Sequence, residues 1–264
     1  MNERQIQEAL THLSLGGLRY FETTGSTNDE AQAWASQGAP DWTLLIADEQ
    51  TAGRGRSGRK WFTPPGSALA FTLILRPSPA EQRFPARVTG LGALSAVDAL
   101  KSLGIEARIK WPNDVLIDGR KVAGVLVESV WAGDSIEAFI VGIGINVMAT
   151  AVPPADQLLF PATSIENALR QSTDRTELLS SILASLKQWR ARLDQDDFIQ
   201  AWQNALAFRG KQVEIIKEGE VPLRGNLLGL ETDGSLLLMV NNKRITVHFG
   251  EMHLRPAPDK ISAG

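Results

Sequence analysis

The first hundred or so residues contain apolar stretches of two kinds. Some are short runs of strand length, and one repeats its apolar positions with the period of a helix. Residues 43–50 and 69–75 are compact apolar runs that predict strands. In residues 86–103 the apolar positions recur at helical spacing, and Gly104 follows directly, as expected where a helix ends. The pattern therefore predicts strands combined with one long helix.

Shorter helices are predicted on either side of these elements. Residues 4–13 form an amphipathic stretch, and a second helix is expected to begin at Thr27. Thr27 is the expected cap, because Glu30 follows three residues later and Gly38 lies just past the end. Helices are expected again over residues 164–207.

Turn sequences divide the middle of the chain into hairpins. Asp118-Gly119 separates two alternating runs, and Gly133-Asp134 leads into the apolar strand FIVGIGINV, residues 139–147. Hairpins pair their strands antiparallel. The sequence thus predicts an α/β (α+β) fold with a mixed, antiparallel-rich sheet.

Beyond Arg209 the pattern changes to short strands separated by turns. The predicted strands are QVEIIK, LRGNLLGL, LLLMV and RITVHF. This rhythm is typical of a small β-barrel, so we expect two domains, residues 1–208 and residues 209–264. A segment of about fifty residues buries too little apolar area to be robust alone. We therefore expect it to dock on the first domain.

Composition narrows the class of protein. The chain has 264 residues, 43% of them hydrophobic and 22% charged, which is ordinary for a globular protein. A formal net charge of −3 argues against general nucleic-acid binding. The absence of cysteine excludes disulfides, thiol nucleophiles and thiolate metal sites. Because the start lacks a secretion signal and no apolar run reaches the ~18 residues of a membrane span, we expect a cytoplasmic protein.

The segment GRGRSGRK, residues 53–60, carries the most unusual local composition. Its first six residues match the spacing of a dinucleotide-binding turn, but that turn needs a helix directly after the glycines. WFTPPG follows instead, so the segment is predicted to join two strands. Its four cations, Arg54, Arg56, Arg59 and Lys60, stand without an acidic residue. An anionic partner is therefore expected.

Four stretches combine unusual composition with strand-end or loop positions: GSTND (25–29), EQTAGRGRSGRKW (49–61), KWPND (110–114) with GRKVAGVLVE (119–128), and GIGIN (142–146). Together they resemble the biotin protein ligases. Their order and separations match the family along nearly the whole chain. The resemblance implies a catalytic domain similar to class II aminoacyl-tRNA synthetases, followed by a small barrel of the Src-homology-3 type.

The resemblance also implies a two-step reaction. Biotin and ATP, with Mg²⁺, give biotinyl-5'-adenylate, and the biotinyl group then passes to a lysine of the biotin carboxyl carrier protein domain of acetyl-CoA carboxylase. Joining a carboxylate to a phosphate brings two anions together, so such a site needs fixed positive charge. Arginine supplies it as a planar fork, and glycine lets the backbone approach.

The resemblance assigns roles to particular residues. The catalytic set is Lys121, Arg56, Asp114 and Lys110. The biotin-binding set is Ser26, Thr27, Asn28, Gln50, Gly53, Arg54, Gly55, Arg56, Trp61, Lys121, Gly124 and Gly142. The ATP-binding set is Arg56, Lys110, Asn113, Lys121 and Asn146. Short hydroxyl and amide side chains suit a urea ring, which has one carbonyl acceptor and two N–H donors.

Several of these residues also fit a simpler role. Lys110 and Lys121 are expected on the two arms of one hairpin, where their ammonium groups converge or merely face solvent. Asp114 fits a magnesium ligand, a proton acceptor for the attacking lysine, or a cap of the turn after Pro112. Trp61 fits a cover for the sulfur-containing ring of biotin or ordinary core packing.

The glycines of GIGIN fit two interpretations as well. Gly142 and Gly144 leave room either for the ligand or for a helix that crowds the strand. An amide such as that of Asn146 can pair with the N6/N7 edge of adenine, as the family uses it. Residues 147–188 contain no tryptophan to stack on that base, and Phe160 is the nearest aromatic residue.

Two other functions remain as alternatives. A lipoate or octanoate ligase has a similar fold, but lipoate lacks the urea that Ser26, Thr27, Asn28 and Gln50 would recognise. An RNA-binding module using the basic segment would show strongly salt-dependent affinity and no ATP turnover. About twenty-five residues precede GSTND, too few for a winged helix-turn-helix, so we expect no DNA binding. The sequence leaves a homodimer open.

Overall fold

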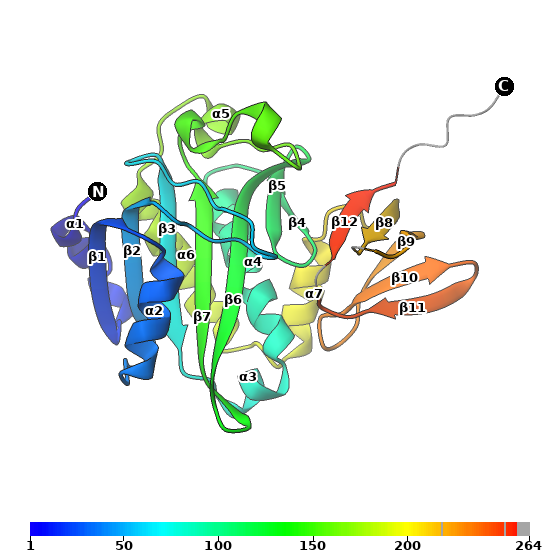
Figure 1. Ribbon diagram of the computed structural model, residues 1–264, viewed down its shortest axis with the longest axis horizontal. Coiled ribbons are helices and arrows are strands. Elements are labelled where there is room, and N and C mark those ends of the chain that lie inside the picture. The colour runs from blue at the N-terminus through cyan, green and yellow to red at the C-terminus, as the bar shows by residue number, and fades with distance from the viewer. Residues whose placement is uncertain (218, 251, 258–264) are drawn as a thin grey trace.

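The computed structural model describes residues 1–217, 219–250 and 252–257, and its strands form two sheets (Figure 1). The central sheet has seven strands in the order β1-β2-β3-β7-β6-β5-β4. These strands are β1 (Gly17–Thr24), β2 (Thr43–Gln50), β3 (Ala68–Leu75), β4 (Ala107–Lys110), β5 (Asp114–Ile117), β6 (Arg120–Ala132) and β7 (Ser135–Asn146). Only β1 and β2 pair in parallel within this sheet, so the prediction of a mixed, antiparallel-rich sheet is confirmed.

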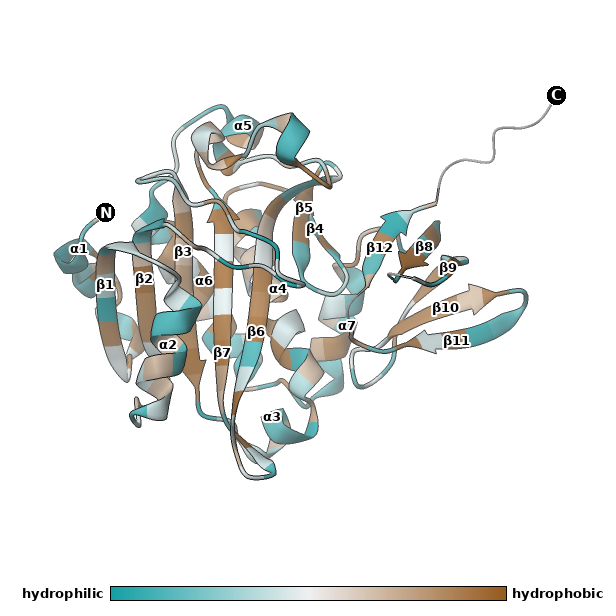
Figure 2. Ribbon diagram, in the orientation of Figure 1, coloured by the Kyte–Doolittle hydropathy of each residue, from teal (hydrophilic) through white to brown (hydrophobic). Residues whose placement is uncertain are grey.

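Strands β3 and β7 lie at the centre of the sheet and are apolar along most of their length (Figure 2). Every residue of β3 is buried, as expected for a strand covered on both faces. The edge strand β1 was not predicted, because its side chains are mostly half-buried or exposed and give no apolar run. The hydrophobic pattern of the sequence thus predicts the buried central strands but not the partly exposed edge strand.

The two predicted hairpin turns are confirmed. Asp118 and Gly119 adopt φ angles of 48° and 72° between β5 and β6, and Gly133 adopts 60° between β6 and β7. One expectation from this region was wrong: Lys110 ends β4 and Lys121 lies on β6, so β5 separates them. The two lysines still face each other across Asp114, as described below.

Helices cover both faces of the central sheet (Figure 1). α2 (Thr27–Ser36) packs on one face against β2, β3 and β7, and α4 (Pro85–Ser102) packs with α6 (Arg175–Arg190) on the other. The cap of α2 is Ser26, not Thr27, which forms the first helical residue. The remaining helices are α1 (Glu3–Ala9), α3 (Pro79–Arg83), α5 (Ile165–Leu169) and α7 (Asp196–Asn204), with short 3₁₀ turns at η1 (Thr11–Leu13), η2 (Ala149–Ala151) and η3 (Ala155–Gln157).

The C-terminal strands form a separate antiparallel sheet, here called the C-terminal sheet, in the order β11-β10-β9-β8-β12. Its strands are β8 (Gln212–Ile216), β9 (Leu223–Leu230), β10 (Leu236–Val240), β11 (Lys243–Val247) and β12 (His253–Pro256). The first four were predicted and β12 was not. The end of the second predicted domain, residues 258–264, lies outside the described residues.

Aromatic side chains fasten the C-terminal sheet to the rest of the molecule. Trp111 donates from Nε1 to the carbonyl oxygen of Gly234 at 3.0 Å, and its ring lies 5.1 Å from that of Phe249. Trp202 on α7 also packs against Gly234. The buried guanidinium of Arg87 on α4 donates from Nε to the carbonyl oxygen of Thr232 at 2.8 Å. The expected docking is thus confirmed.

None of the helices in the described part of the chain is both long and apolar enough to cross a membrane.

Candidate active site

The basic segment folds as a narrow ribbon between β2 and β3. Trp61 donates its backbone N–H to Gly53 at 2.8 Å, and Gly55 donates to Arg59 at 2.7 Å. A Cβ on Gly53 would lie only 2.5 Å from the carbonyl oxygen of Trp61, so glycine is required for this approach. Ser57 and Gly58 turn the tip with φ angles of 54° and 69°. The prediction of a strand-to-strand connection is confirmed.

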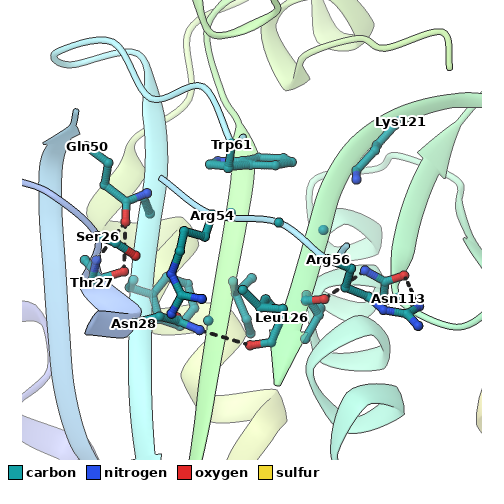
Figure 3. A pocket seen from close by; sticks show the side chains of 18 residues that line it. Ser26, Thr27, Asn28, Gln50, Arg54, Arg56, Trp61, Asn113, Lys121 and Leu126 are labelled. Atoms are coloured by element: carbon teal, nitrogen blue, oxygen red, sulfur yellow. Dashed lines mark hydrogen bonds between the residues drawn. The ribbon is translucent and has the colours of Figure 1, made fainter. Parts of the chain in front are cut away.

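A cavity lies between this ribbon, the N-terminus of α2 and strands β6 and β7. We call it the first cavity. Eleven of the twelve residues assigned above to biotin line it, all except Gly53. They are Ser26, Thr27, Asn28, Gln50, Arg54, Gly55, Arg56, Trp61, Lys121, Gly124 and Gly142. In Figure 3 the polar residues of α2 and Gln50 face Arg56 and Lys121 across the cavity.

Hydrogen bonds fix the polar side of the first cavity. Gln50 Oε1 accepts from the backbone N–H of Thr27 at 2.8 Å and from its hydroxyl at 3.1 Å. The buried hydroxyl of Thr72 on β3 lies 2.7 Å from Asn28 Oδ1 and 2.8 Å from Thr27 Oγ1. Ser26 lines the cavity and makes no capping bond to the helix. The result is a rigid group of hydroxyl and amide side chains.

Arg54 pairs inside the protein. Its two Nη atoms donate to Glu128 Oε1 and Oε2 at 2.8 and 2.7 Å, and Nη2 also lies 2.7 Å from Asp29 Oδ1. The bond to Glu128 is the main cause that raises the pKa of the Arg54 guanidinium above its ordinary value. The anionic partner of Arg54 is thus a carboxylate of the chain itself. Glu128 also accepts from Asn28 Nδ2 at 2.7 Å.

The glycines beneath the ribbon make room for protein side chains. A Cβ on Gly142 would lie 2.1 Å from Asn28 Oδ1, and a Cβ on Gly144 would lie 2.4 Å from the Trp61 indole. A Cβ on Gly124, which pairs with Gly144, would lie 3.1 Å from Lys121 Nζ. At Gly142 the close neighbour is thus a side chain of α2, while the glycine also lines the first cavity, so both interpretations offered for GIGIN fit it. The indole Nε1 of Trp61 is buried and has no hydrogen-bond partner among the described residues.

A second cavity opens beside the first and is lined by cations. The two cavities share Arg56, Asn113 and Lys121, together with Gly55 and Trp61. Arg56 donates from Nη1 to Asn113 Oδ1 at 3.2 Å and from Nη2 to the carbonyl oxygen of Gly250 at 2.5 Å. Arg56 therefore bridges KWPND and the connection between β11 and β12 at the junction of the two cavities.

Lys110, Asp114 and Lys121 form an ion triad in the second cavity. Both distances from a lysine Nζ to an Asp114 carboxylate oxygen are 2.6 Å. Burial alone would raise the pKa of Asp114, but the charges of Lys121 and Lys110 outweigh it and hold that pKa well below its ordinary value. Burial lowers the pKa of Lys110, against the opposing charge of Asp114. Neither lysine is a plain surface residue, since their side chains are 6% and 28% exposed.

The C-terminal sheet adds a histidine to this cavity. His253 on β12 lines it, and its Nδ1 lies 3.2 Å from Arg59 Nη2. Nearby, the Phe160 ring centroid lies 4.2 Å from Lys110 Nζ and 5.0 Å from the guanidinium carbon of Arg255. Asn146 lines neither cavity, and its Nδ2 donates to the carbonyl oxygen of Thr163 at 3.0 Å.

Known proteins resemble this chain over most of its length. The model of the biotin/lipoate A/B protein ligase family matches residues 20–146. The bifunctional ligase/repressor BirA of Bacillus subtilis is 32% identical over 259 residues, which cover 96% of this chain and 79% of that protein. The biotin–(acetyl-CoA-carboxylase) ligase of Paracoccus denitrificans is 37% identical over 225 residues, 81% of this chain and 91% of that protein. The chain belongs to the biotin protein ligases.

A solved structure of this family agrees with the fold. The biotin protein ligase from Aquifex aeolicus in complex with biotin and ATP has a TM-score of 0.79 to this chain. That similarity covers 91% of this chain and 99% of the Aquifex chain at 29% identity. The mixed α/β fold is thus shared with a biotin protein ligase.

For this biotin protein ligase, sequence reasoning missed residues that support the site from other elements. Thr72, Glu128 and His253 belong to β3, β6 and β12, outside the residues assigned from the motifs. An acidic residue ending the apolar run VAGVLVE was the available signal for Glu128. The sequence around Thr72 and His253 contains no motif that would have indicated a role in the site.

Proposed function

We propose that this chain joins biotin to ATP as biotinyl-5'-adenylate and transfers the biotinyl group to a lysine of the biotin carboxyl carrier protein of acetyl-CoA carboxylase. The observation that carries the proposal is the junction of a polar cavity with a cationic one at Arg56, Asn113 and Lys121. A substrate with a neutral polar head and an anionic tail fits this arrangement. The carrier protein is the partner implied by the name of the Paracoccus denitrificans relative.

The polar end of the first cavity suits the urea ring of biotin. Ser26, Thr27, Asn28 and Gln50 present hydroxyl and amide groups that complement one carbonyl and two N–H groups. Trp61 offers an apolar face and an unpartnered indole N–H beside them. Lipoate has no urea, and these polar groups would remain unsatisfied with it, which opposes binding.

The cationic end suits the reacting carboxylate and phosphate. In the first step a carboxylate oxygen of biotin bonds to the α-phosphorus, and the bond from that phosphorus to the leaving oxygen of pyrophosphate breaks. Negative charge is concentrated there, and preorganised ammonium and guanidinium groups stabilise it. Lys121 and Arg56 line both cavities and would therefore meet both anions. Lys110 and Asn113 line the second cavity, where the phosphates would lie.

Asp114 positions the two lysines in this proposal. Its pKa lies well below the ordinary value, so it has little affinity for the proton of an attacking amine. Each of its oxygens already faces a lysine, and no cluster of three potential metal-binding side chains occurs among the described residues. The residues present therefore do not fit a protein-held magnesium ion. We assign Mg²⁺ to this reaction only as a companion of ATP.

The finer classification of the fold is also a proposal. The mixed central sheet with helices on both faces supports a catalytic domain similar to class II aminoacyl-tRNA synthetases. The small antiparallel C-terminal sheet supports a barrel of the Src-homology-3 type, with a domain boundary near residue 209. Cytoplasmic location, a homodimer and the absence of DNA binding stay predictions.

Isothermal calorimetry tests the proposed function directly. We expect biotin to bind the protein, and ATP with Mg²⁺ to tighten that binding as the adenylate forms. Lipoate under the same conditions is expected to give no heat of binding. Tighter binding of lipoate than of biotin would favour the lipoate-ligase alternative, and RNA binding without ATP turnover would favour the RNA-binding alternative.

A further inference from the structure

Glu128 is an acidic residue on β6 that stands between the basic ribbon and α2. Its side chain is 23% exposed and contacts both elements. Oε1 accepts from Arg54 Nη1 at 2.8 Å, and Oε2 accepts from Arg54 Nη2 and from Asn28 Nδ2, each at 2.7 Å. One carboxylate therefore joins an arginine of the ribbon to an amide of the first cavity.

The charge of Glu128 helps to determine which way the Asn28 amide points, because its bond to Nδ2 at 2.7 Å is much shorter than the 3.5 Å contact of Nδ2 with the carbonyl oxygen of Leu126 (Figure 3). An ionised carboxylate only accepts hydrogen bonds, so the NH₂ group of Asn28 must face it. Asn28 Oδ1 then faces Thr72, whose hydroxyl lies 2.7 Å away. A carbonyl oxygen has two lone pairs, so Oδ1 keeps one for a further donor. An N–H of a urea ring is a donor of that kind.

The same charge holds the ribbon down. The two parallel bonds from Arg54 to Glu128 form a bidentate pair, the strongest common geometry for these groups. Arg54 pairs with Lys60 across the ribbon, and the next residue, Gly55, lines both cavities. Holding Arg54 therefore holds the part of the ribbon that closes over the first cavity.

We propose that Glu128 is a positioning residue for biotin binding, which aims the Asn28 amide at the urea ring and clamps the ribbon through Arg54. The inference rests on the proposed function and deepens it, because it couples recognition of the urea to closure of the ribbon. Asp29 shares Arg54 with Glu128, since its Oδ1 lies 2.7 Å from Nη2, and it supports the same clamp.

The variant Glu128→Gln tests the proposal with little change of shape. The neutral amide no longer requires the Asn28 NH₂ group to face it, and it loses the charge-assisted pair with Arg54. Charge-assisted hydrogen bonds of this kind predict a Kd for biotin weaker by roughly tenfold or more. We expect KM for biotin to rise by a similar factor, while kcat at saturating biotin and KM for ATP stay near those of the unmodified protein. A loss of general structure would instead lower kcat and change both KM values.

A matched control is Glu137→Gln on the neighbouring strand β7. Glu137 pairs with Arg76 at 3.1 Å and lines neither cavity, so its loss is expected to leave the biotin Kd unchanged. Glu128→Asp keeps the charge but shortens the side chain by one methylene, so it carries the test if Glu128→Gln does not fold. We expect it to weaken biotin binding as well, because a shorter carboxylate cannot reach Asn28 and Arg54 together.

A double-mutant cycle with Arg54→Gln examines the clamp. If Arg54 acts through Glu128, the double variant should lose little more affinity than Glu128→Gln alone, and Arg54→Gln alone should lose less, because it leaves the bond to Asn28 in place. Glu128 variants that fold and bind biotin as the unmodified protein does would overturn the inference and leave the proposed function standing. A folded unmodified protein that does not bind biotin would overturn both.

Discussion

At the residue scale, arginines of the same motif have different surroundings. Arg54 makes its pairs within the protein, with Glu128 and Asp29. Arg59 instead reaches His253 on β12, and Arg56 reaches Gly250 in the connection that precedes this strand. A pattern of alternating glycine and arginine cannot distinguish these roles, because the distinction depends on which strand lies below the ribbon.

Lys121 gives the sharpest residue-scale prediction. It borders both cavities, so Lys121→Ala removes one preorganised charge from the place where carboxylate and phosphate meet. We expect the rate of biotin-dependent pyrophosphate release to fall by ~100-fold. Lys101→Ala on helix α4, an exposed lysine, is the control and should leave the rate unchanged. A near-normal rate in Lys121→Ala would remove this lysine from the mechanism.

The residues predicted from motifs converge in space for a physical reason. Ser26, Thr27 and Asn28 share the N-terminus of one helix, and Gln50 ends the strand beside it. Such local placement is readable from sequence. Glu128 was not readable, because its partners lie 74 and 100 residues away and depend on the register of β6.

At the element scale, the basic ribbon connects three parts of the molecule. Its base is held over β6 by Arg54, whereas its tip contacts KWPND and the C-terminal sheet through Arg56 and Arg59. The ribbon therefore covers the first cavity and borders the second. Its conformation depends on all three contacts.

The contacts of Arg56 predict how well the ribbon retains a reactive intermediate. Arg56→Gly removes the bonds to Asn113 and Gly250 and adds backbone freedom at the tip. We expect adenylate formation to continue, while biotinyl-5'-adenylate leaves the protein about tenfold faster. A chase with unlabelled biotin after formation of the labelled intermediate measures this release. Unchanged retention would contradict the expectation.

The contact between Arg59 and His253 predicts a pH response of the ribbon. A guanidinium N–H bonds to a histidine nitrogen only while that nitrogen is unprotonated. Burial and the charges of Arg59, Arg255, Lys110 and Arg56 lower the pKa of His253. The stabilisation is therefore complete above the ordinary histidine pKa of about 6.5 and is lost as pH falls through the lower value.

Hydrogen exchange of the ribbon amides, corrected for the intrinsic pH effect, measures this response. We expect protection to stay constant above about pH 6.5 and to decline as the pH falls below it, and His253→Asn to abolish this decline. Protection that does not change as the pH falls in the unmodified protein would contradict a pH-dependent contact between Arg59 and His253.

Elements were predictable where burial gave them a distinct pattern. The fully buried strand β3 and the long helix α4 were predicted within a residue or two of their ends. β1 and β12 were missed, because edge strands with half-buried side chains carry no strong periodicity. The cap of α2 was misplaced by one residue, since Ser26 and Thr27 are both suitable caps by type.

At the scale of the whole molecule, the two sheets are joined by a closely packed aromatic contact. The Trp202 indole lies between Gly90 of α4 and Gly234 of the C-terminal sheet. A Cβ on Gly90 would lie 2.4 Å from the Trp202 ring, and one on Gly234 would lie 2.7 Å from it. These glycines therefore permit the two sheets to approach. The sequence predicted that the sheets dock but not by which residues.

Gly90→Ala tests this contact with a single methyl group. In an open helical position the change would stabilise by about 1 kcal/mol. Here the methyl group meets the indole, and we expect the free energy of unfolding to fall by about 1–3 kcal/mol, as overpacking costs. Denaturant unfolding measures the change. The same substitution in a Trp202→Phe background should cost less, and a stabilising effect would disprove the tight contact.

The reach of Arg56 and Arg59 to Gly250 and His253 limits how this protein can be recombined with its relatives. A chimaera that kept residues 1–208 and took the remainder from another ligase would replace His253, the partner of Arg59, and the backbone around Gly250, the acceptor of Arg56. Grafting the ribbon together with residues 250–256 would keep both pairs. The ribbon and the segment around Gly250 and His253 lie nearly two hundred positions apart in the sequence, but they should be exchanged between ligases together.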